Sequence, residues 1–168
     1  IVLEVGLGGR LDATTAHPFR PLIAMAAIGL DHCEFLGQTL AEIAKEKAAV
    51  ISEGSIVISS YQEPEVKEII QTIVSQKNAK IVWAPPLSKN WELGLAGDIQ
   101  RENAAVAKGV LEALIEMGWR INIQHIKDGL ASALWPGRLQ LKNWEGRPIR
   151  LDGAHNPHAI KQLSKERL

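Results

Sequence analysis

The chain lacks a second cysteine, a net charge and a long apolar run. Cys33 is the one cysteine among 168 residues, so an internal disulfide is excluded and a reducing, cytoplasmic compartment is expected. Basic and acidic residues balance at 19 each, so the charge favours neither nucleic acid nor an anionic membrane as a partner. No apolar run approaches the roughly 20 residues of a membrane-spanning helix. A signal peptide and an initiator methionine are also absent, and from the start "IVLEVG" we expect that a longer protein continues upstream.

What the chain does contain is an alternation of strand-like runs and helical patterns, in a sequence that is 46% hydrophobic. This order predicts an α/β fold with a mostly parallel sheet. We expect strands at residues 1–5, 22–28, 55–59 and 80–83. We expect helices at 39–51, from Pro64 onward, from a cap at Asp98 to Gly118, and at 123–134. Residues 85–97 show no periodicity and are interpreted as a connection.

The helical patterns give way to strand candidates and turn residues near Trp135–Gly137, where we place a domain boundary. After it, two strand candidates flank a turn at Glu145 and Gly146, and a last helix starts at Asn156. Residues 1–134 are therefore predicted to form part of one domain. Residues 135–168 are predicted to be the start of a second domain whose sheet is cut off before it closes.

The helix at 39–51 raises a specific question, because it directs a lysine toward the core. Thr39 and Glu42 have the spacing of a capping box, and Lys47 falls in the middle of the apolar stripe that follows. One interpretation is that the stem of Lys47 packs inside while its ammonium reaches the rim. The other is that burial favours the neutral amine, which can add CO₂ and become a carbamate that binds metal.

Two polar clusters follow strands, where ligands of open α/β sheets bind. In "EVGLGGRLD", Glu4 is a carboxylate inside an apolar strand, and the glycines after it let a ligand approach backbone amides closely. In "GLDH", Asp31 and His32 are plausible ligands of a divalent metal. The alternatives are a salt bridge from Glu4 to Arg10 and an ordinary hydrogen-bonded surface role for His32.

A third polar cluster lies at the predicted domain boundary, in "WPGRLQ" and "DGAHNP". Arg138 follows a turn there, and Asp152 with His155 follows a strand. An arginine and a carboxylate at a domain boundary can bind a nucleotide and close the domains over it. The alternative is a turn stabilised by Asp152 and an ordinary helix cap at Asn156.

Taken together, these segments resemble the folylpolyglutamate synthase and dihydrofolate synthase family of the Mur ligase superfamily. The resemblance runs from Glu4 to the C-terminus and rests on "EVGLGGRLDAT", "GLDHCEFLGQTLAEIAKEKAAVI", "GDIQRENAAVA", "WPGRLQ" and "DGAHNPHAI", in that order. It implies an ATP-dependent ligase that activates the carboxylate of a pteroate or folate as an acyl phosphate, which the amino group of L-glutamate then attacks. The fold it implies is an incomplete P-loop-type central domain followed by a Rossmann-like domain.

The resemblance also implies roles for particular residues. The magnesium ligands would be Glu4 and His32, together with Lys47 as the carbamate. Lys47, His32 and Arg138 would serve catalysis. ATP would be bound by Asn103 near the adenine, by Arg138 at the phosphates, and by Asp152 and His155. The full-length protein is expected to be a monomer.

The sequence departs from the family pattern at several positions. Thr15 stands where the family has asparagine, Ile99 stands where histidine is common, and "EKAAV" replaces "EKAGI". The larger departure is that no G-x-x-x-x-G-K-[ST] phosphate loop occurs in these residues. We therefore interpret the chain as an internal fragment that is inactive alone. The alternatives are another Mur-type amino-acid ligase, a nicotinamide-binding Rossmann domain suggested by "VGLGG", and a non-catalytic nucleotide-binding module.

Overall fold

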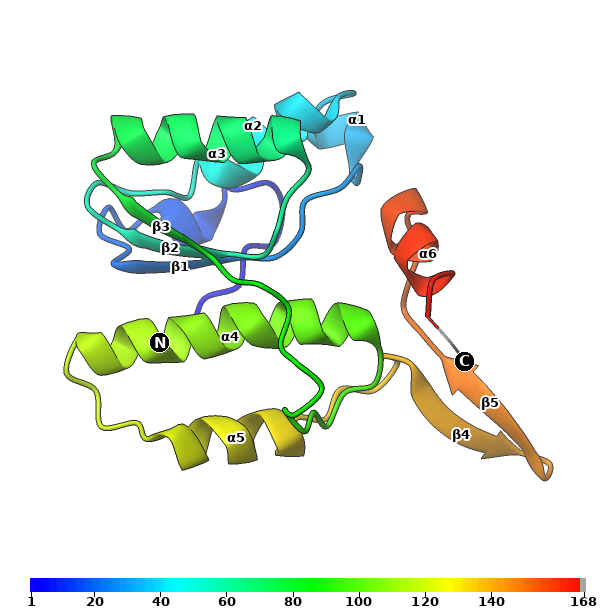
Figure 1. The fold of residues 1–168 in the computed structure, drawn as a ribbon. Coiled ribbons are helices and arrows are strands. Elements are labelled where there is room, and N and C mark those ends of the chain that lie inside the picture. The colour runs from blue at the N-terminus through cyan, green and yellow to red at the C-terminus, as the bar shows by residue number, and fades with distance from the viewer. Residues whose placement is uncertain (167–168) are drawn as a thin grey trace. The chain divides into compact units, whose positions relative to one another are not determined.

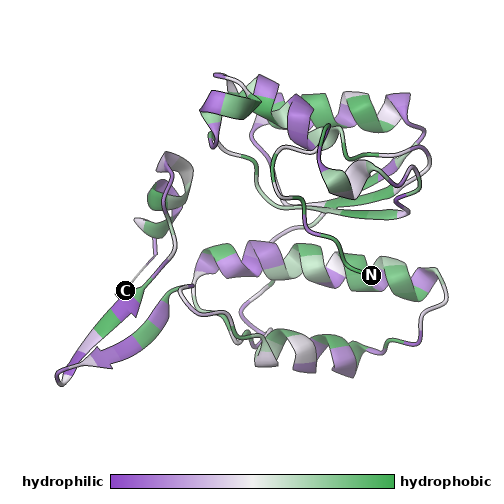
Figure 2. Cartoon of the chain, turned by 180° about the vertical axis from the view of Figure 1, so that it is seen from behind, coloured by the Kyte–Doolittle hydropathy of each residue, from purple (hydrophilic) through white to green (hydrophobic). Residues whose placement is uncertain are grey.

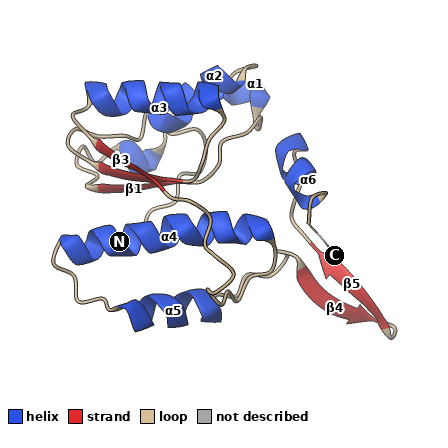
Figure 3. Cartoon of the chain, in the orientation of Figure 1, coloured by secondary structure: helices blue, strands red, loops and turns tan. Residues whose placement is uncertain are grey.

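The computed structural model describes residues 1–166, which divide into two compact units, Ile1–Pro85 and a second unit from Pro86 onward. The chain is an α/β protein with a parallel sheet, as the sequence predicts (Figure 1; Figure 3). The division at Pro85 falls at the start of the segment interpreted as a connection, and residues 85–97 contain no helix or strand. The boundary placed near Trp135–Gly137 from composition stays a prediction.

The first unit is built on a three-stranded sheet in the order β1-β2-β3. Its strands are β1 Leu22–Met25, β2 Ile56–Ser59 and β3 Lys80–Trp83, and both pairings are parallel. Its helices are the 3₁₀ turn η1 Ala13–Thr15 and the α-helices α1 Cys33–Leu36, α2 Leu40–Ala48 and α3 Pro64–Gln76. Helices α2 and α3 lie together over one face of the sheet (Figure 1).

The core of the first unit lies between that face and the two helices. The apolar stripe predicted on α2 is confirmed, because Ile43, Ala44 and Ala48 are completely buried. The core also contains buried residues of the strands and of α3, namely Ile23, Met25, Val57, Val66, Ile70 and Val74. Burial of this apolar surface fixes the rotation of α2 about its axis, and therefore the direction in which its polar residues point.

The capping box predicted at the start of α2 is confirmed. The Thr39 hydroxyl accepts a hydrogen bond from the Glu42 backbone N–H at 3.2 Å, and the Glu42 carboxylate accepts one from the Thr39 N–H at 3.0 Å. Hydrogen bonds from the backbone and the hydroxyl of Thr39, and then from the backbone of Gln38, lower the pKa of Glu42. Pro64 occupies the first turn of α3, also as predicted.

The strand predicted at residues 1–5 is wrong. The segment has no regular structure, and Ile1 and Val2 are fully exposed. A strand is held by the ladder that it forms with a neighbour, and within residues 1–166 no other strand pairs with this segment. Its apolar sequence is consistent with a strand, but sequence alone does not provide the partner.

The second unit contains two helices, a hairpin and a terminal helix. They are α4 Asp98–Glu116, α5 Ile123–Ser132, β4 Gln140–Trp144, β5 Arg147–Leu151 and α6 Pro157–Leu163. The predicted turn is confirmed, since Glu145 and Gly146 both have positive φ between the antiparallel strands β4 and β5. Both strands mix hydrophobic and hydrophilic residues (Figure 2), and most of their side chains are exposed.

The longest helix is α4, and it ends as predicted, with Gly118 at φ +93° immediately after its cap. In residues 1–166 the structure has no helix with the length and the apolar character that a membrane crossing requires.

Candidate active site

A cavity of about 230 Å³ in the first unit is lined by residues from three segments that the sequence analysis singled out, namely "EVGLGGRLD", "GLDH" and the helix that carries Lys47. Its walls include residues 5–8 of the glycine loop (residues 5–12), residues 24–28 at the end of β1, and Asp31, His32, Lys47 and Val50. Segments separated by up to about 40 residues in the chain therefore meet at the carboxyl end of a parallel strand, which is where open α/β sheets bind ligands.

His32 enters this cavity from a constrained backbone. Its φ is +50°, in the left-handed region that non-glycine residues rarely adopt, and its carbonyl oxygen accepts the first hydrogen bonds of α1. The Asp31 carboxylate accepts a hydrogen bond from the His32 backbone N–H at 3.0 Å and lies 3.7 Å from the His32 Nε2. The imidazole is 46% exposed, so it is open to a ligand.

Lys47 reaches the same cavity from α2. It is half-buried, whereas Lys45 on the same helix is exposed. The two neighbouring core residues, Ala44 and Ala48, fix the turn of the helix on which Lys47 lies. The structure therefore brings His32 and Lys47 together at one cavity, as their joint assignment to one site requires.

The glycine loop packs against α2 rather than standing open. A Cβ atom on Gly9 would lie 2.7 Å from the Glu46 carbonyl oxygen and 3.1 Å from that of Lys47, so only glycine fits there. The backbone N–H of Arg10 donates to the Glu46 carbonyl at 3.2 Å, and its Nε pairs with the Glu46 carboxylate at 2.9 Å. The alternative salt bridge from Glu4 to Arg10 is therefore wrong, because Arg10 pairs with Glu46.

Asp12 organises the glycine loop, and the sequence analysis missed it. One carboxylate oxygen accepts hydrogen bonds from the N–H groups of Gly6 (2.9 Å) and Leu7 (3.1 Å), and the other accepts two from Thr14. The hydroxyl of Thr14, then its backbone N–H, then those of Leu7 and Gly6, lower the pKa of Asp12 to about 2. The amide of Gly6, expected to be open to a ligand, is thus used within the loop, as is that of Leu7. An Asp followed two residues later by Thr was the available signal.

The side chains at the cavity suit a metal ion only with a modification. Within residues 1–166 no three His, Cys, Asp or Glu side chains gather closely enough to hold one. Glu4 is exposed and does not line the cavity, although its neighbour Val5 does. Asp31 and His32 supply oxygen and nitrogen donors, and a carbamate on Lys47, which lines the same cavity, would add oxygens.

Arg138 and Asp152, two of the candidate residues of the second unit, lie at one turn. The Asp152 carboxylate accepts hydrogen bonds from the backbone N–H of Leu139 at 2.9 Å and of Ala154 at 2.8 Å, which joins "WPGRLQ" to "DGAHNP". Leu139 is buried and has a φ of +46°, so this bond holds a strained residue in place. Asp152 therefore stabilises the turn, as the structural interpretation of this segment predicted, with both carboxylate oxygens in use. Arg138, beside Leu139, is exposed.

The two remaining candidates of the second unit are His155 and Asn103. His155 is exposed, and its Nδ1 lies 2.8 Å from the Gly153 carbonyl oxygen. Asn103 is exposed on α4, where its amide donates to Gln100 at 3.2 Å. Neither side chain lines the larger cavity of the second unit.

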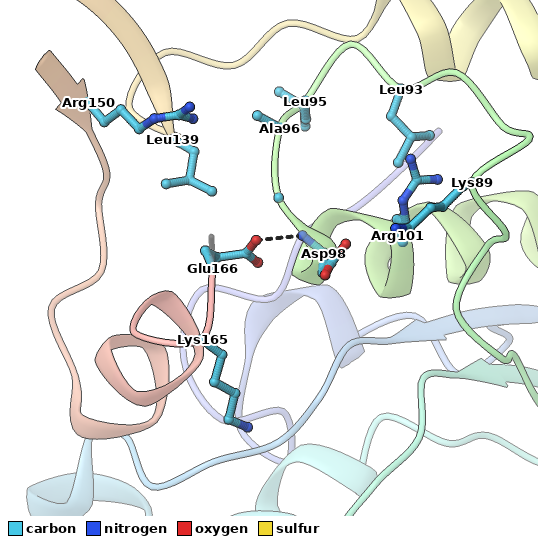
Figure 4. Close-up of a pocket in the computed structure, with 11 residues that line it drawn as sticks. Lys89, Leu93, Leu95, Ala96, Asp98, Arg101, Leu139, Arg150, Lys165 and Glu166 are labelled. Carbon is cyan, nitrogen blue, oxygen red and sulfur yellow. Dashed lines mark hydrogen bonds between the residues drawn. The ribbon is translucent and has the colours of Figure 1, made fainter. Parts of the chain in front are cut away.

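That larger cavity, of about 440 Å³, lies at the start of α4 (Figure 4). The Glu166 carboxylate accepts hydrogen bonds from the backbone N–H groups of Asp98 (2.8 Å) and Ile99 (3.1 Å), so it caps the helix. The prediction that Asp98 is the cap is wrong, because Gly97 holds that position and makes no side-chain bond. Four cationic side chains, not identified from the sequence, also line the cavity: Lys89, Arg101, Arg150 and Lys165.

Comparison with known proteins yields a consistent set of relatives, although no family model matches the chain. The chain is 33% identical to a dihydrofolate synthase/folylpolyglutamate synthase of Bacillus subtilis, 36% identical to a dihydrofolate synthetase of Saccharomyces cerevisiae and 34% identical to a dihydrofolate synthase/folylpolyglutamate synthase of Escherichia coli. Each match covers 98% of this chain and 41–44% of the relative. The chain thus spans less than half the length of these curated relatives.

Solved structures give the same result. An FPGS–AMPPCP–folate complex matches 96% of the chain with a TM-score of 0.86 at 27% identity, over 45% of its own length. E. coli FolC in complex with DHPP and ADP matches 95% of the chain with a TM-score of 0.79 at 30% identity, over 41% of its own length. Sequence and fold therefore agree on one group of proteins over nearly the whole chain.

Proposed function

We propose that this chain, a member of the folylpolyglutamate synthase and dihydrofolate synthase family by sequence and by fold, carries part of the active site of an ATP-dependent ligase. The reaction joins L-glutamate to dihydropteroate, to folyl(poly)glutamate, or to both. A substrate carboxylate oxygen attacks the γ-phosphorus of ATP and releases ADP, which gives an acyl phosphate. The amino nitrogen of glutamate then attacks the acyl carbon, and inorganic phosphate leaves.

The observation that carries this proposal is the convergence of His32, Asp31 and Lys47 with the glycine loop on one cavity. A ligase of this class needs cationic groups and fixed positions more than it needs covalent chemistry, because phosphoryl transfer depends mainly on positioning and charge neutralisation. A Mg²⁺ ion bound here would neutralise phosphate charge. Its proposed ligands are His32, Lys47 as the carbamate, and Glu4, which is next to a residue of the cavity wall.

In the second unit we assign ATP binding to Arg138, Asn103, Asp152 and His155. Arg138 is the strongest of these candidates, because its exposed guanidinium is carried on a turn that Asp152 fixes. Asp152 would act through that turn, since hydrogen bonds to Leu139 and Ala154 already use both of its oxygens.

The test compares Lys47→Ala with Lys45→Ala, an exposed lysine on the same helix, in the full-length protein, because the chain alone is expected to be inactive. We expect Lys47→Ala to lower glutamate-dependent ADP release by at least about 100-fold and Lys45→Ala to leave it unchanged. The protein is also incubated with ¹³C-labelled bicarbonate, and the carbamate carbon is observed by NMR. That signal should be present in Lys45→Ala and absent in Lys47→Ala. Full activity in Lys47→Ala would refute the assignment.

A second comparison tests the nucleotide assignment, with Arg138→Ala against Lys142→Ala on the exposed face of β4. Arg138→Ala should raise the KM for ATP by about 10-fold or more, because a charge-assisted contact to phosphate is lost. Lys142→Ala should leave that KM unchanged. Equal KM values for the two variants would refute the assignment of Arg138 to ATP binding.

A further inference from the structure

The segment after β1 that delivers Asp31 and His32 to the cavity is held by one side chain outside it, Gln62. This glutamine lies between β2 and α3. Its Oε1 accepts a hydrogen bond from the Ile28 backbone N–H at 2.9 Å, and its Nε2 donates to the Ala26 carbonyl oxygen at 2.9 Å. The same Nε2 donates to the Ser59 hydroxyl at 3.1 Å, which ties the amide to the end of β2.

The orientation of this amide is fixed by its partners. A backbone N–H can only donate and a carbonyl can only accept, so the oxygen of Gln62 must face Ile28 and its nitrogen must face Ala26. Side chains that cannot both donate and accept at this reach cannot make the same pair of bonds. A glutamate would place a carboxylate oxygen against the Ala26 carbonyl, with no proton between them at neutral pH.

These bonds matter because the segment has few others. The ladder between β1 and β2 ends at Met25, whose carbonyl accepts from the Ser60 N–H. Between Ala26 and Leu30, the two bonds to Gln62 are the backbone hydrogen bonds found within the described part of the chain. Residues 24–28 form one wall of the cavity, and His32 follows four residues after Ile28.

We propose that Gln62 is a positioning residue of the candidate active site, which fixes residues 26–32 and thereby the place of Asp31 and His32 at the cavity. It does not line the cavity and acts through the backbone that it holds. This inference rests on the proposed function for its effect on catalysis. Its effect on the geometry of His32 does not depend on that function.

The test uses Gln62→Glu and Gln62→Ala in the full-length protein that contains this chain, with Gln71→Glu as the matched control. Gln71 is exposed on α3, so the control makes the same chemical change on the surface of the same unit. We expect both Gln62 variants to lower kcat by roughly 10- to 100-fold, because small displacements of catalytic groups have effects of that size. The KM for ATP should change less than kcat, since the residues assigned above to ATP lie outside the segment that Gln62 holds. Gln71→Glu should behave like the unmodified protein.

Two NMR measurements give readouts that do not require ligase activity. The imidazole resonances of His32 should shift in both Gln62 variants and stay in place in Gln71→Glu. In the unmodified protein, the Ile28 amide should exchange with solvent at least 10-fold more slowly than the amide of Leu30.

The outcomes separate the two proposals. If the unmodified protein has no ligase activity but the His32 resonances respond as described, the positioning role stands and the proposed function fails. If His32 is unchanged in Gln62→Ala, the positioning role is overturned. Should the variants fail to fold, the exchange measurement in the unmodified protein decides, and an Ile28 amide that exchanges as fast as that of Leu30 overturns the proposal.

Discussion

In the first unit Lys47 lies on a helix that is packed into the core, whereas in the second unit Arg138 and Asp152 lie at a turn closed by hydrogen bonds. Lys47 lies on a helix with completely buried neighbours, and the sheet behind it is packed against α2 and α3. Arg138 instead lies beside a turn held by Asp152, next to a hairpin with exposed large side chains such as Leu141 and Trp144.

The difference shows which assignments depend on packing and which depend on individual polar bonds. A residue on a packed helix keeps its direction when one hydrogen bond is lost, because several buried apolar contacts fix the helix. A residue on a turn held by one carboxylate loses its geometry when that carboxylate is removed. The following predictions test this contrast, from the largest expected effect to the smallest.

The largest effect is expected from truncating the core of the first unit. Ile70→Ala removes a completely buried side chain of α3 and should lower the free energy of unfolding by about 2–5 kcal/mol. Leu141→Ala, in the hairpin of the second unit, changes a side chain that is 62% exposed and should lower it by less than about 1 kcal/mol. Urea unfolding curves of the two variants measure both values. Equal losses would break the contrast between the units.

The helix caps should give the next largest effect. Thr39→Ala removes the capping box of α2, and Asn122→Ala removes the matching box of α5, in which Asn122 accepts from the His125 N–H at 2.9 Å. Each change should lower the free energy of unfolding by about 1 kcal/mol. Helix α2 should stay folded, whereas α5, with Ile126 as its completely buried anchor, should fray at its first turn. Amide exchange in the two first turns checks this, and equal fraying would contradict it.

The glycine loop is expected to weaken in acid. The pKa of Asp12 is about 2 in the folded protein against an ordinary value of 3.8, so its stabilising contribution is complete above about pH 5 and is lost as the pH falls toward 2. An asparagine at this position does not titrate. The stability difference between the unmodified protein and Asp12→Asn should therefore shrink as the pH is lowered from 4 to 2, as followed by urea unfolding. A constant difference over this range would contradict the assignment.

The smallest effect concerns the buried serines of the first unit. The Ser60 hydroxyl is buried and has no hydrogen-bond partner among residues 1–166, so Ser60→Ala should leave stability unchanged or raise it by up to about 1 kcal/mol. Ser55 is equally buried, but its hydroxyl donates to the Ser52 carbonyl at 2.9 Å. Ser55→Ala should therefore lower stability by about 1 kcal/mol. Thermal unfolding of both variants measures the sign of each change, and a loss in Ser60→Ala would reveal a missing partner.

Much of the local structure follows from the sequence, because most of its caps and turns depend on residues that are close in the chain and not on a distant partner. The capping box at Thr39, the proline at the start of α3, the glycine after α4 and the hairpin turn at Glu145 and Gly146 are all confirmed. Each depends on the conformational preference of one or two residues or on a bond that spans a few positions. The errors arise where a distant partner decides. Residues 1–5 form no strand without a neighbour, and Glu166, 68 residues away, takes the capping role predicted for Asp98.

For the candidate site, the sequence by itself determined that the face of α2 bearing Lys47 is apolar, and that Asp31 and His32 follow a strand. Only the tertiary structure decided that His32 and Lys47 share a cavity while Glu4 lies outside it, and that Asp12 uses amides of the glycine loop. Only it revealed Gln62, a single polar side chain with no periodic pattern around it. The physical reason is one of range, because periodicity and caps are set within a few residues, whereas pairing across the fold depends on how the elements pack.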